Sequence, residues 1–132
     1  FIHLGDVEGG EEYINAVVDC EKHMVRGNND FFSDLPREEE FRIGPWKAFI
    51  THGHAYYVSL DSEYIVEEAK ARKADIVMFG HTHKPYFHQV DGIIVLNPGS
   101  LSFPRQDGRK GSYMIMNVDE NGELHFEQKY LD

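Results

Sequence analysis

Four short apolar runs share one kind of ending, and this constrains the fold more than any other feature of the sequence. Each run stops at a small or hydroxyl-bearing residue, and a side chain able to bind a metal ion follows at once. The endings are Gly5-Asp6, Gly27-Asn28, Thr51-His52 and Gly80-His81. Ligands of an open α/β sheet bind at the carboxyl ends of its strands. If the four runs are neighbouring strands of one sheet, the four side chains converge on one site.

The donor atoms at these endings indicate which ion the site would take. Asp6 offers a carboxylate, Asn28 an amide oxygen, and His52, His81 and His83 offer imidazole nitrogens. The set contains no thiolate, so it suits a harder divalent ion such as Mn or Fe, with Zn also suitable. A carboxylate can bridge two such ions, which together activate a water and hold the oxygens of a phosphate. Singly, Asp6 and Asn28 would be ordinary turn residues, but the set as a whole favours metal ligands.

Apolar periodicity predicts an α/β first part and a β-rich second part. Strands are expected at residues 1–4, 24–26, 46–50 and 76–79, and helices at 11–22 and from Asp61 or Ser62 to about Lys73. Two antiparallel hairpins are expected further on, 86–90 with 93–96 around Asp91-Gly92, and 113–118 with 124–130. Cys20 falls on the apolar face of the first helix, which places it in the core. Glu38-Glu39-Glu40 reads as a solvated charge run.

Composition limits the classes of partner. The chain has 132 residues, which suits one domain over 1–132, and its net charge of −10 should repel long nucleic acids. A small anionic substrate would therefore need a local positive centre such as a metal ion. No apolar run approaches the roughly 20 residues that span a bilayer, and no signal peptide is visible. A single cysteine allows no intrachain disulfide, which fits a cytoplasmic protein.

The motifs, taken together, resemble those of the calcineurin-like metallophosphoesterases, and the small bacterial and archaeal phosphodiesterase branch in particular. The matching stretches are Gly5-Asp6, Gly27-Asn28-Asn29-Asp30, Thr51-His52-Gly53-His54, Gly80-His81-Thr82-His83, and Asn97-Pro98-Gly99-Ser100 followed by Pro104-Arg105. They occur in the family's order and cover essentially the whole chain. The resemblance implies a four-layer α/β/β/α sandwich and a metal-dependent phosphodiesterase that acts on a small phosphodiester.

The resemblance also implies roles for individual residues. It makes Asp6 the bridging ligand, puts Asn28, His52 and His81 on one metal, and puts His83 on the other. Two divalent ions are expected, Mn first, with Fe, Ni, Zn or Mg as alternatives. A hydroxide bridging the metals would attack phosphorus in line. Relatives often form dimers or tetramers, so a homo-oligomer is an open expectation.

The sequence departs from the family pattern in two places. The family carries an Asp-x-His motif one strand-helix unit before Gly5-Asp6, and this chain begins at Phe1 with no residues there. We therefore expect either that Phe1 is not the natural start or that the protein is catalytically degenerate. Asn29 stands where larger phosphatases of the superfamily have a histidine that assists the leaving group. Asn29 cannot donate a proton in that way, so activated diesters should be better substrates than alkyl monoesters.

Several roles and functions stay open at this point. His54 is the nearest candidate to assist the leaving group, but it equally fits a group that supports the ligands. Asn29 and Arg105 are expected to contact substrate, although a salt bridge that braces a loop explains Arg105 equally well. Four aromatic residues near the motifs would line the pocket or pack in the core, namely Phe31, Phe32, Tyr56 and Tyr57. The rival function is a protein-binding scaffold on the same fold, as in the retromer sorting complex, and a closed structural zinc site is the weakest alternative.

Overall fold

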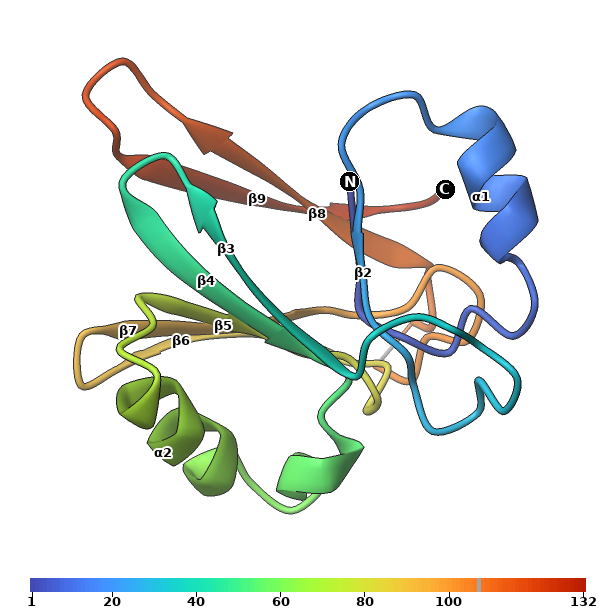
Figure 1. Cartoon of the computed structure of the whole chain (residues 1–132), viewed down its shortest axis with the longest axis horizontal. Helices are drawn as coiled ribbons and strands as arrows, with labels where there is room; N and C mark the ends of the chain where they lie inside the picture. Colours follow the sequence, from blue (N-terminus) through green and yellow to red (C-terminus); the bar gives the residue numbers. More distant parts are fainter. Residues whose placement is uncertain (107) are drawn as a thin grey trace.

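The computed structural model of the protein describes residues 1–106 and 108–132, and its centre is a five-stranded mixed sheet. The strand order in this sheet is β3-β4-β5-β7-β6 (Figure 1). The bounds of its strands are β3 Glu38–Ile43, β4 Trp46–Thr51, β5 Ile76–Met78, β6 Pro85–Val90 and β7 Ile93–Pro98. The three inner strands β4, β5 and β7 run parallel, and both edge strands run antiparallel to their neighbours.

The remaining elements lie outside this sheet. Two short strands, β1 (Ile2–His3) and β2 (His23–Met24), form a parallel pair, and β8 (Ser112–Val118) with β9 (Leu124–Tyr130) forms an antiparallel hairpin. The helices are α1 (Glu11–Val17), the 3-10 turn η1 (His54–Tyr56) and α2 (Glu63–Ala71). Figure 1 shows α2 below the five-stranded sheet, with the hairpin and the β1-β2 pair above it.

Each face of the five-stranded sheet buries its own apolar core. Toward α2, Phe49 and Val77 from the sheet pack with Ile65 from the helix, and all three are fully buried. Toward the hairpin, Ile50 and Met78 pack with residues in or directly after the outer strands, which include Leu4, Val25, Met114, Met116 and Phe126. The two cores separate the α2 layer, the five-stranded sheet and an outer β layer, and α1 lies beside the β1-β2 pair at the surface of the molecule (Figure 1). The expected four-layer α/β/β/α arrangement is therefore confirmed.

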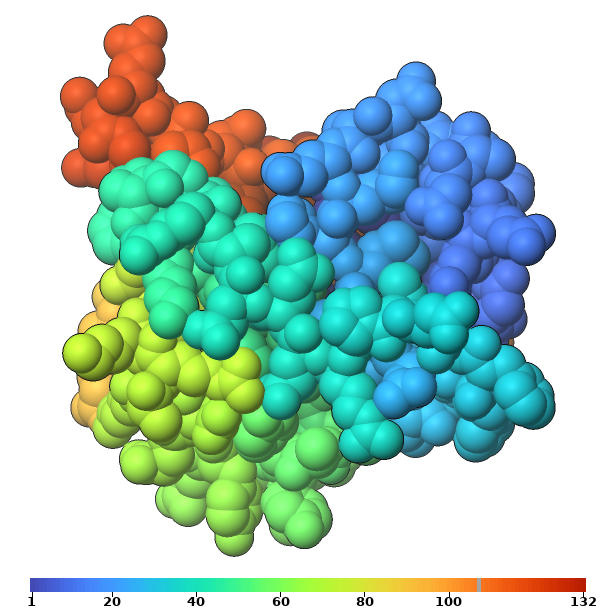
Figure 2. All heavy atoms as spheres, in the orientation of Figure 1, coloured from blue at the N-terminus to red at the C-terminus, as the bar shows by residue number. Residues whose placement is uncertain are grey.

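The first helix is shorter and more exposed than its sequence predicts. It ends at Val17, because Val18 is extended at φ −105° and ψ 113°, a region that β-branched residues favour. None of its side chains is buried, Tyr13 is 73% exposed, and Cys20 is exposed beyond the helix end. The prediction that Cys20 lies in the core is thus wrong. The apolar spacing is real, but Tyr13 and Val17 on that face are exposed, and the N-terminal part of the chain, in blue, lies at the outer edge of the molecule (Figure 2).

The acidic run at Glu38 to Glu40 is a strand rather than a solvated charge run. It starts β3, the edge strand that pairs with β4. Its charges are paired, because Arg72 Nη2 lies 3.2 Å from Glu38 Oε1 and Lys47 Nζ lies 2.9 Å from Glu40 Oε1. Glu39 points to the opposite face, where it contacts His23. Acidic residues on both faces hide the period-two apolar signal of a strand until Phe41.

Both predicted hairpins are confirmed, and one shows why its turn is readable from sequence. Asp91 and Gly92 have φ values of 51° and 80°, the two left-handed positions that a tight two-residue hairpin requires. The other hairpin joins Val118 to Leu124 through a longer turn. None of the helices in the described part of the chain is both long and apolar enough to span a membrane.

Candidate metal centre

The predicted ligands come from the carboxyl ends of strands in two sheets, not from one sheet as the sequence suggested. Asp6 and Asn28 follow the β1-β2 pair, whereas His52 and His81 follow β4 and β5 of the five-stranded sheet. The two sheet ends meet closely at Gly5, whose φ is +107°. A Cβ on Gly5 would overlap the His52 ring from the other sheet end and would lie 2.8 Å from the backbone nitrogen of Gly27, too close for any other residue. Glycine therefore permits the convergence.

Asp6, His52 and His81 form the centre of this convergence. Asp6 Oδ2 lies 3.3 Å from His52 Nε2, and His81 Nδ1 lies 3.3 Å from the same His52 nitrogen. On the other side of its ring, His52 Nδ1 lies 2.6 Å from the carbonyl oxygen of Leu4. This carbonyl can only accept, so Nδ1 carries the proton and Nε2 keeps a lone pair toward Asp6. A carboxylate oxygen and an imidazole lone pair thus face each other with no proton between them.

Burial keeps the two histidines neutral. His52 is 2% exposed, and burial lowers its pKa below the ordinary value, against the smaller effects of the Leu4 carbonyl and the Asp6 charge. Burial likewise lowers the pKa of His81, and the nearby His52 and His54 rings lower it further. Neutral imidazoles beside a carboxylate are electron-pair donors at neutral pH. The donor chemistry fits a divalent cation, which Asp6 Oδ2 and His52 Nε2 could share across their 3.3 Å separation with His81 beside them. Among the described residues, only Asp119, Glu123 and His125 bring three donor atoms within 4.8 Å of one another, so His81 would have to move toward Asp6 to join the same ion.

A buried carboxylate holds the two loops of the β1-β2 end together. Asp30 Oδ2 accepts hydrogen bonds from the backbone N–H groups of Gly27 (2.8 Å), Asp6 (2.8 Å) and Val7 (3.3 Å). Its Oδ1 accepts a fourth from Glu8 at 2.7 Å. Burial of Asp30 would raise its pKa, but the four N–H donors outweigh that effect and the pKa is lowered. Asp30, held as an ionised carboxylate, therefore fixes the backbone of Asp6.

The backbone at the predicted ligands adopts an uncommon conformation. Asp6, His81 and His83 have φ values of 60°, 67° and 61°, in the left-handed region that few non-glycine residues enter. Such conformations cost of order 1–3 kcal/mol each and persist where the surroundings impose them, often at functional sites. Three such residues lie in the loops that follow β1 and β5. This indicates that the backbone of these loops is held in the conformation that places the Asp6, His81 and His83 side chains.

The other predicted residues lie around this centre at different distances from it. Asn29 donates from its backbone N–H to Asp6 Oδ1 (2.9 Å) and from Nδ2 to Asp6 Oδ2 (3.1 Å), so it contacts the carboxylate. His54 is exposed on η1, with its ring centroid 5.4 Å from that of His52 and 6.1 Å from that of His81. Asn28 is exposed at the loop surface. Their roles as ligand, substrate contact or proton donor stay predictions.

His83 stands apart from the other histidines. Its Nδ1 lies 2.9 Å from the carbonyl oxygen of Phe103, and its own carbonyl accepts the backbone N–H of Arg105 at 3.0 Å. The Nδ1 contact fixes the proton there and leaves Nε2 as a donor atom for a metal. Arg105 braces this loop through its backbone, and it forms no ion pair with any residue in 1–106 or 108–132. The salt-bridge explanation of Arg105 thus finds no support in the described residues.

The aromatic residues near the motifs divide between surface and core. Phe31 and Phe32 are 78% and 102% exposed, so neither packs in the core. Because both side chains face solvent, neither forms the wall of an enclosed pocket. Tyr56 is half-buried and packs edge-on against Phe49, with the ring centroids 6.1 Å apart. Tyr57 is 59% exposed.

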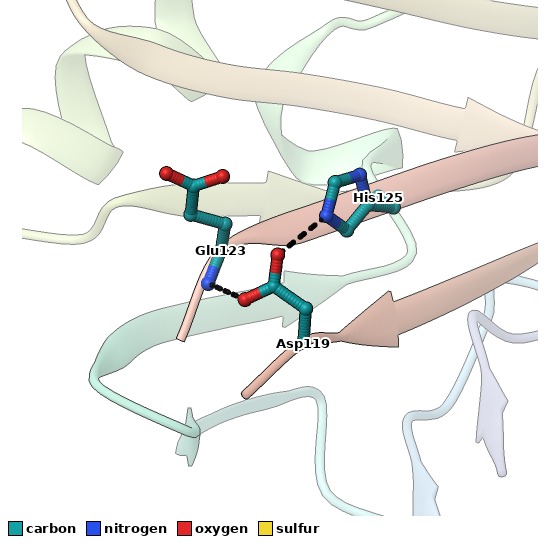
Figure 3. A group of neighbouring side chains, drawn as sticks. All are labelled: Asp119, Glu123 and His125. Atoms are coloured by element: carbon teal, nitrogen blue, oxygen red, sulfur yellow. Dashed lines mark hydrogen bonds and ion pairs between the residues drawn. The ribbon is translucent and has the colours of Figure 1, made fainter. Parts of the chain in front are cut away.

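A second cluster of possible ligands lies far along the chain, at the tip of the β8-β9 hairpin. Donor atoms of Asp119, Glu123 and His125 all lie within 4.8 Å of one another (Figure 3). The Asp119 carboxylate already accepts hydrogen bonds from the N–H groups of Asn121 and Glu123 and contacts His125 Nε2 at 2.8 Å. It closes the turn, which is a structural role. Sequence reasoning missed the grouping, although Glu123, just before β9, and His125 are two residues apart, the spacing that places side chains on one face of an extended chain.

Comparison with known proteins identifies the family. The sequence model of the calcineurin-like phosphoesterase superfamily domain matches residues 1–121. A probable metallophosphoesterase of Methanocaldococcus jannaschii is 35% identical over 105 residues, which is 79% of this chain and 54% of that protein. A phosphodiesterase of Escherichia coli is 32% identical over 104 residues, covering 72% and 52%. The chain thus spans about half the length of these two relatives.

A solved structure supports the same assignment. The zinc complex of Vps29 from Entamoeba histolytica superimposes with a TM-score of 0.74 at 26% identity, over 92% of this chain and 76% of that one. The strand-end loops that carry Asp6, His52 and His81 therefore belong to a fold that is shared well beyond the sequence match. This chain belongs to the calcineurin-like phosphoesterase superfamily.

Proposed function

We propose that the protein is a metal-dependent phosphodiesterase that hydrolyses small phosphodiesters at the centre formed by Asp6, His52 and His81. The observation that carries the proposal is the pair of electron-pair donors, Asp6 Oδ2 and His52 Nε2, that face each other 3.3 Å apart. A relative of similar sequence is named a phosphodiesterase, which supports the same reaction class. The net charge of −10 makes a bound cation the natural means of attracting an anionic substrate.

The proposal assigns two divalent ions, with Mn as the preferred one. Asp6 would be shared between them, Asn28, His52 and His81 would hold one, and His83 would contribute to the other. Bound there, the ions would supply the Lewis acidity and positive charge that phosphoester hydrolysis needs. The oxygen and nitrogen donor set, without sulfur, supports Mn over softer ions.

The chain's own residues would perform the remaining tasks. Asn29, through its two bonds to the Asp6 carboxylate, would fix the orientation of that ligand. His54 is exposed on η1 beside the His52 and His81 rings, which supports a role as the group that would protonate the leaving group. Because Asn29 cannot donate a proton as a histidine would, activated diesters should react faster than alkyl monoesters. We also propose a cytoplasmic location, consistent with the lone Cys20.

The test is hydrolysis of bis(p-nitrophenyl) phosphate by the full gene product that contains this chain. We expect turnover that depends on added Mn²⁺, is abolished in His81→Ala, and is retained in His88→Ala, an exposed histidine on β6. Turnover that is indifferent to Mn²⁺ or to His81 would refute the proposal. His54→Ala should slow substrates with poor leaving groups more than p-nitrophenyl esters, and an equal effect on both would refute its proton-donor role.

The second candidate is a protein-binding scaffold. Two observations favour it, the likeness to Vps29 and the exposed apolar side chains Tyr13 and Val17 on α1. One experimental result distinguishes the phosphodiesterase from the scaffold. A folded protein that binds Mn²⁺ at this site but never hydrolyses a diester would favour the scaffold.

A further inference from the structure

A cleft opens beside the loop that carries His81 and His83. It has a volume of about 550 Å³ and is lined by the segment Val58–Ser62, by Thr82 and Lys84, by the start of β6, and by Arg105. Pockets of roughly 300–1,000 Å³ hold ligands the size of a drug or a nucleotide. The cleft is therefore too large for a phosphate group alone and large enough for the second arm of a diester.

The cleft shares its walls with both histidine loops. Thr82, between His81 and His83, lines it directly, and its Oγ1 is fixed by a hydrogen bond from Asn97 Nδ2 at 3.0 Å. At the other loop, Gly53 follows His52, and a Cβ on Gly53 would lie 2.8 Å from Cγ2 of Val58, a cleft residue. A phosphodiester held at the metal centre therefore has this cleft as an adjacent space for one of its substituents.

Charge in the cleft is opposite in sign to that of the whole protein. Lys84 and Arg105 both line it and are exposed to solvent. Within residues 1–106 and 108–132, Asp61 is the one acidic residue of the lining, and its Oδ1 already accepts the backbone N–H of Glu63 at 3.0 Å. Among the described lining residues, two cations and one carboxylate sum to +1, whereas the whole chain carries −10. Such a local positive surface selects an anionic group.

The rest of the lining is apolar with two hydroxyl groups. Val58, Leu60 and Tyr86 offer apolar surface, and Leu60 is 79% exposed. The hydroxyls of Ser62 and Tyr86 lie 3.3 Å apart and can bond a polar substituent. Apolar walls, a few polar groups and a cationic rim suit an arm that has a ring and a charge, as a nucleotide has.

We propose that this cleft is a specificity subsite for a phosphodiester whose second arm is about the size of a nucleoside and bears a further phosphate. Lys84 and Arg105 would hold that phosphate, and the Val58–Ser62 segment with Tyr86 would hold the rest of the arm. The inference rests on the proposed function, since it places the scissile phosphate at the metal centre. It narrows the substrate class from small diesters to diesters with a second anionic group.

The test uses two substrates that differ only in the extra phosphate, thymidine 5′-(p-nitrophenyl phosphate) and its 3′-phosphorylated form. Water adds to phosphorus and the bond to the phenolic oxygen breaks, so each releases p-nitrophenol, with the thymidine mono- or bisphosphate as the other product. We expect the Mn²⁺-loaded protein to prefer the 3′-phosphorylated substrate about tenfold in kcat/KM, since each exposed cation contributes roughly threefold. Lys84→Gln and Arg105→Gln should each reduce this ratio, and the double variant should bring it near one.

The matched control is Lys110→Gln, an exposed cation outside the cleft lining, which should leave the ratio unchanged. Hydrolysis of both substrates at equal efficiency would overturn the subsite and leave the proposed function standing. If neither substrate is hydrolysed, the proposed function fails, and calorimetry still tests the cleft. Tighter binding of thymidine 3′,5′-bisphosphate than of the 5′-monophosphate, lost in the double variant, would support the subsite. Equal binding of the two nucleotides would overturn it.

Discussion

Removal of the Asp30 carboxylate should loosen the β1-β2 end of the site by an amount that its hydrogen bonds allow us to estimate. Asp30 is 5% exposed and accepts four backbone N–H bonds. Three donors, on Gly27, Asp6 and Val7, are buried or half-buried, whereas Glu8 is exposed and can turn to water. At about 1 kcal/mol net for each of the three, Asp30→Ala should cost about 3 kcal/mol of unfolding free energy.

Asp30→Asn should cost less, because one amide oxygen can still serve the three inner donors. The variant loses the charge and the bond to Glu8, so we expect a cost of about 1 kcal/mol. Urea denaturation at pH 7 measures both variants. Asp34→Ala, at an exposed position of the same loop, is the control and should stay within about 0.5 kcal/mol of the wild type.

The pH dependence gives a second, independent check. The pKa of Asp30 is lower in the folded protein than in the unfolded chain, so its stabilisation is complete above the ordinary pKa of about 4. The stabilisation is lost as pH falls through the folded-state value. The stability gap between wild type and Asp30→Asn should therefore narrow between pH 6 and pH 3. Equal costs for the Ala and Asn variants, or a gap independent of pH, would refute the assigned role.

Further predictions concern the site and the core. Gly27→Ala would place a Cβ against the Asp6 carboxylate and backbone nitrogen, so Mn²⁺ binding by calorimetry should weaken by at least tenfold, and wild-type affinity would contradict the close approach. Burial lowers the pKa of His52, so its neutral form stabilises the fold above the ordinary value near 6.5. The unfolding free energy of the metal-free protein should thus fall from pH 7 to pH 5, and it should fall less steeply in His52→Asn. If the unfolding free energies of the two proteins follow parallel curves against pH, His52 does not contribute this pH dependence. Phe49→Ala should cost about 3–5 kcal/mol in urea denaturation, whereas Phe32→Ala should be close to neutral.

The strand ends, the ligand-type residues after them and the hairpin turn were predictable from the sequence, because each depends on residues adjacent in the chain. A short apolar run stopped by a residue such as Gly5 or Gly80 ends a strand, and a ligand-type residue just after it lies at the sheet's carboxyl edge. Asp91-Gly92 predicts its turn because both positions must take positive φ. These predictions do not depend on which strand pairs with which, so they hold in the folded protein.

The features that the sequence did not predict depend on contacts between residues far apart in the chain. The acidic start of β3 is stable as a strand because Arg72, from the end of α2, and Lys47 neutralise it. The contact of Asn29 with Asp6 depends on two loops that only the fold brings together. Apolar spacing in α1 predicts a buried face, but burial also requires a neighbour, which the described residues do not provide for Val17.

The most direct test of the account is to locate the metal itself. Crystals grown with Mn²⁺ and measured at the manganese absorption edge would give an anomalous difference map. We expect a peak within bonding distance of Asp6, His52 and His81. A map without density there, or with its peak only at Asp119 and His125 on the hairpin tip, would contradict the assignment of the metal centre.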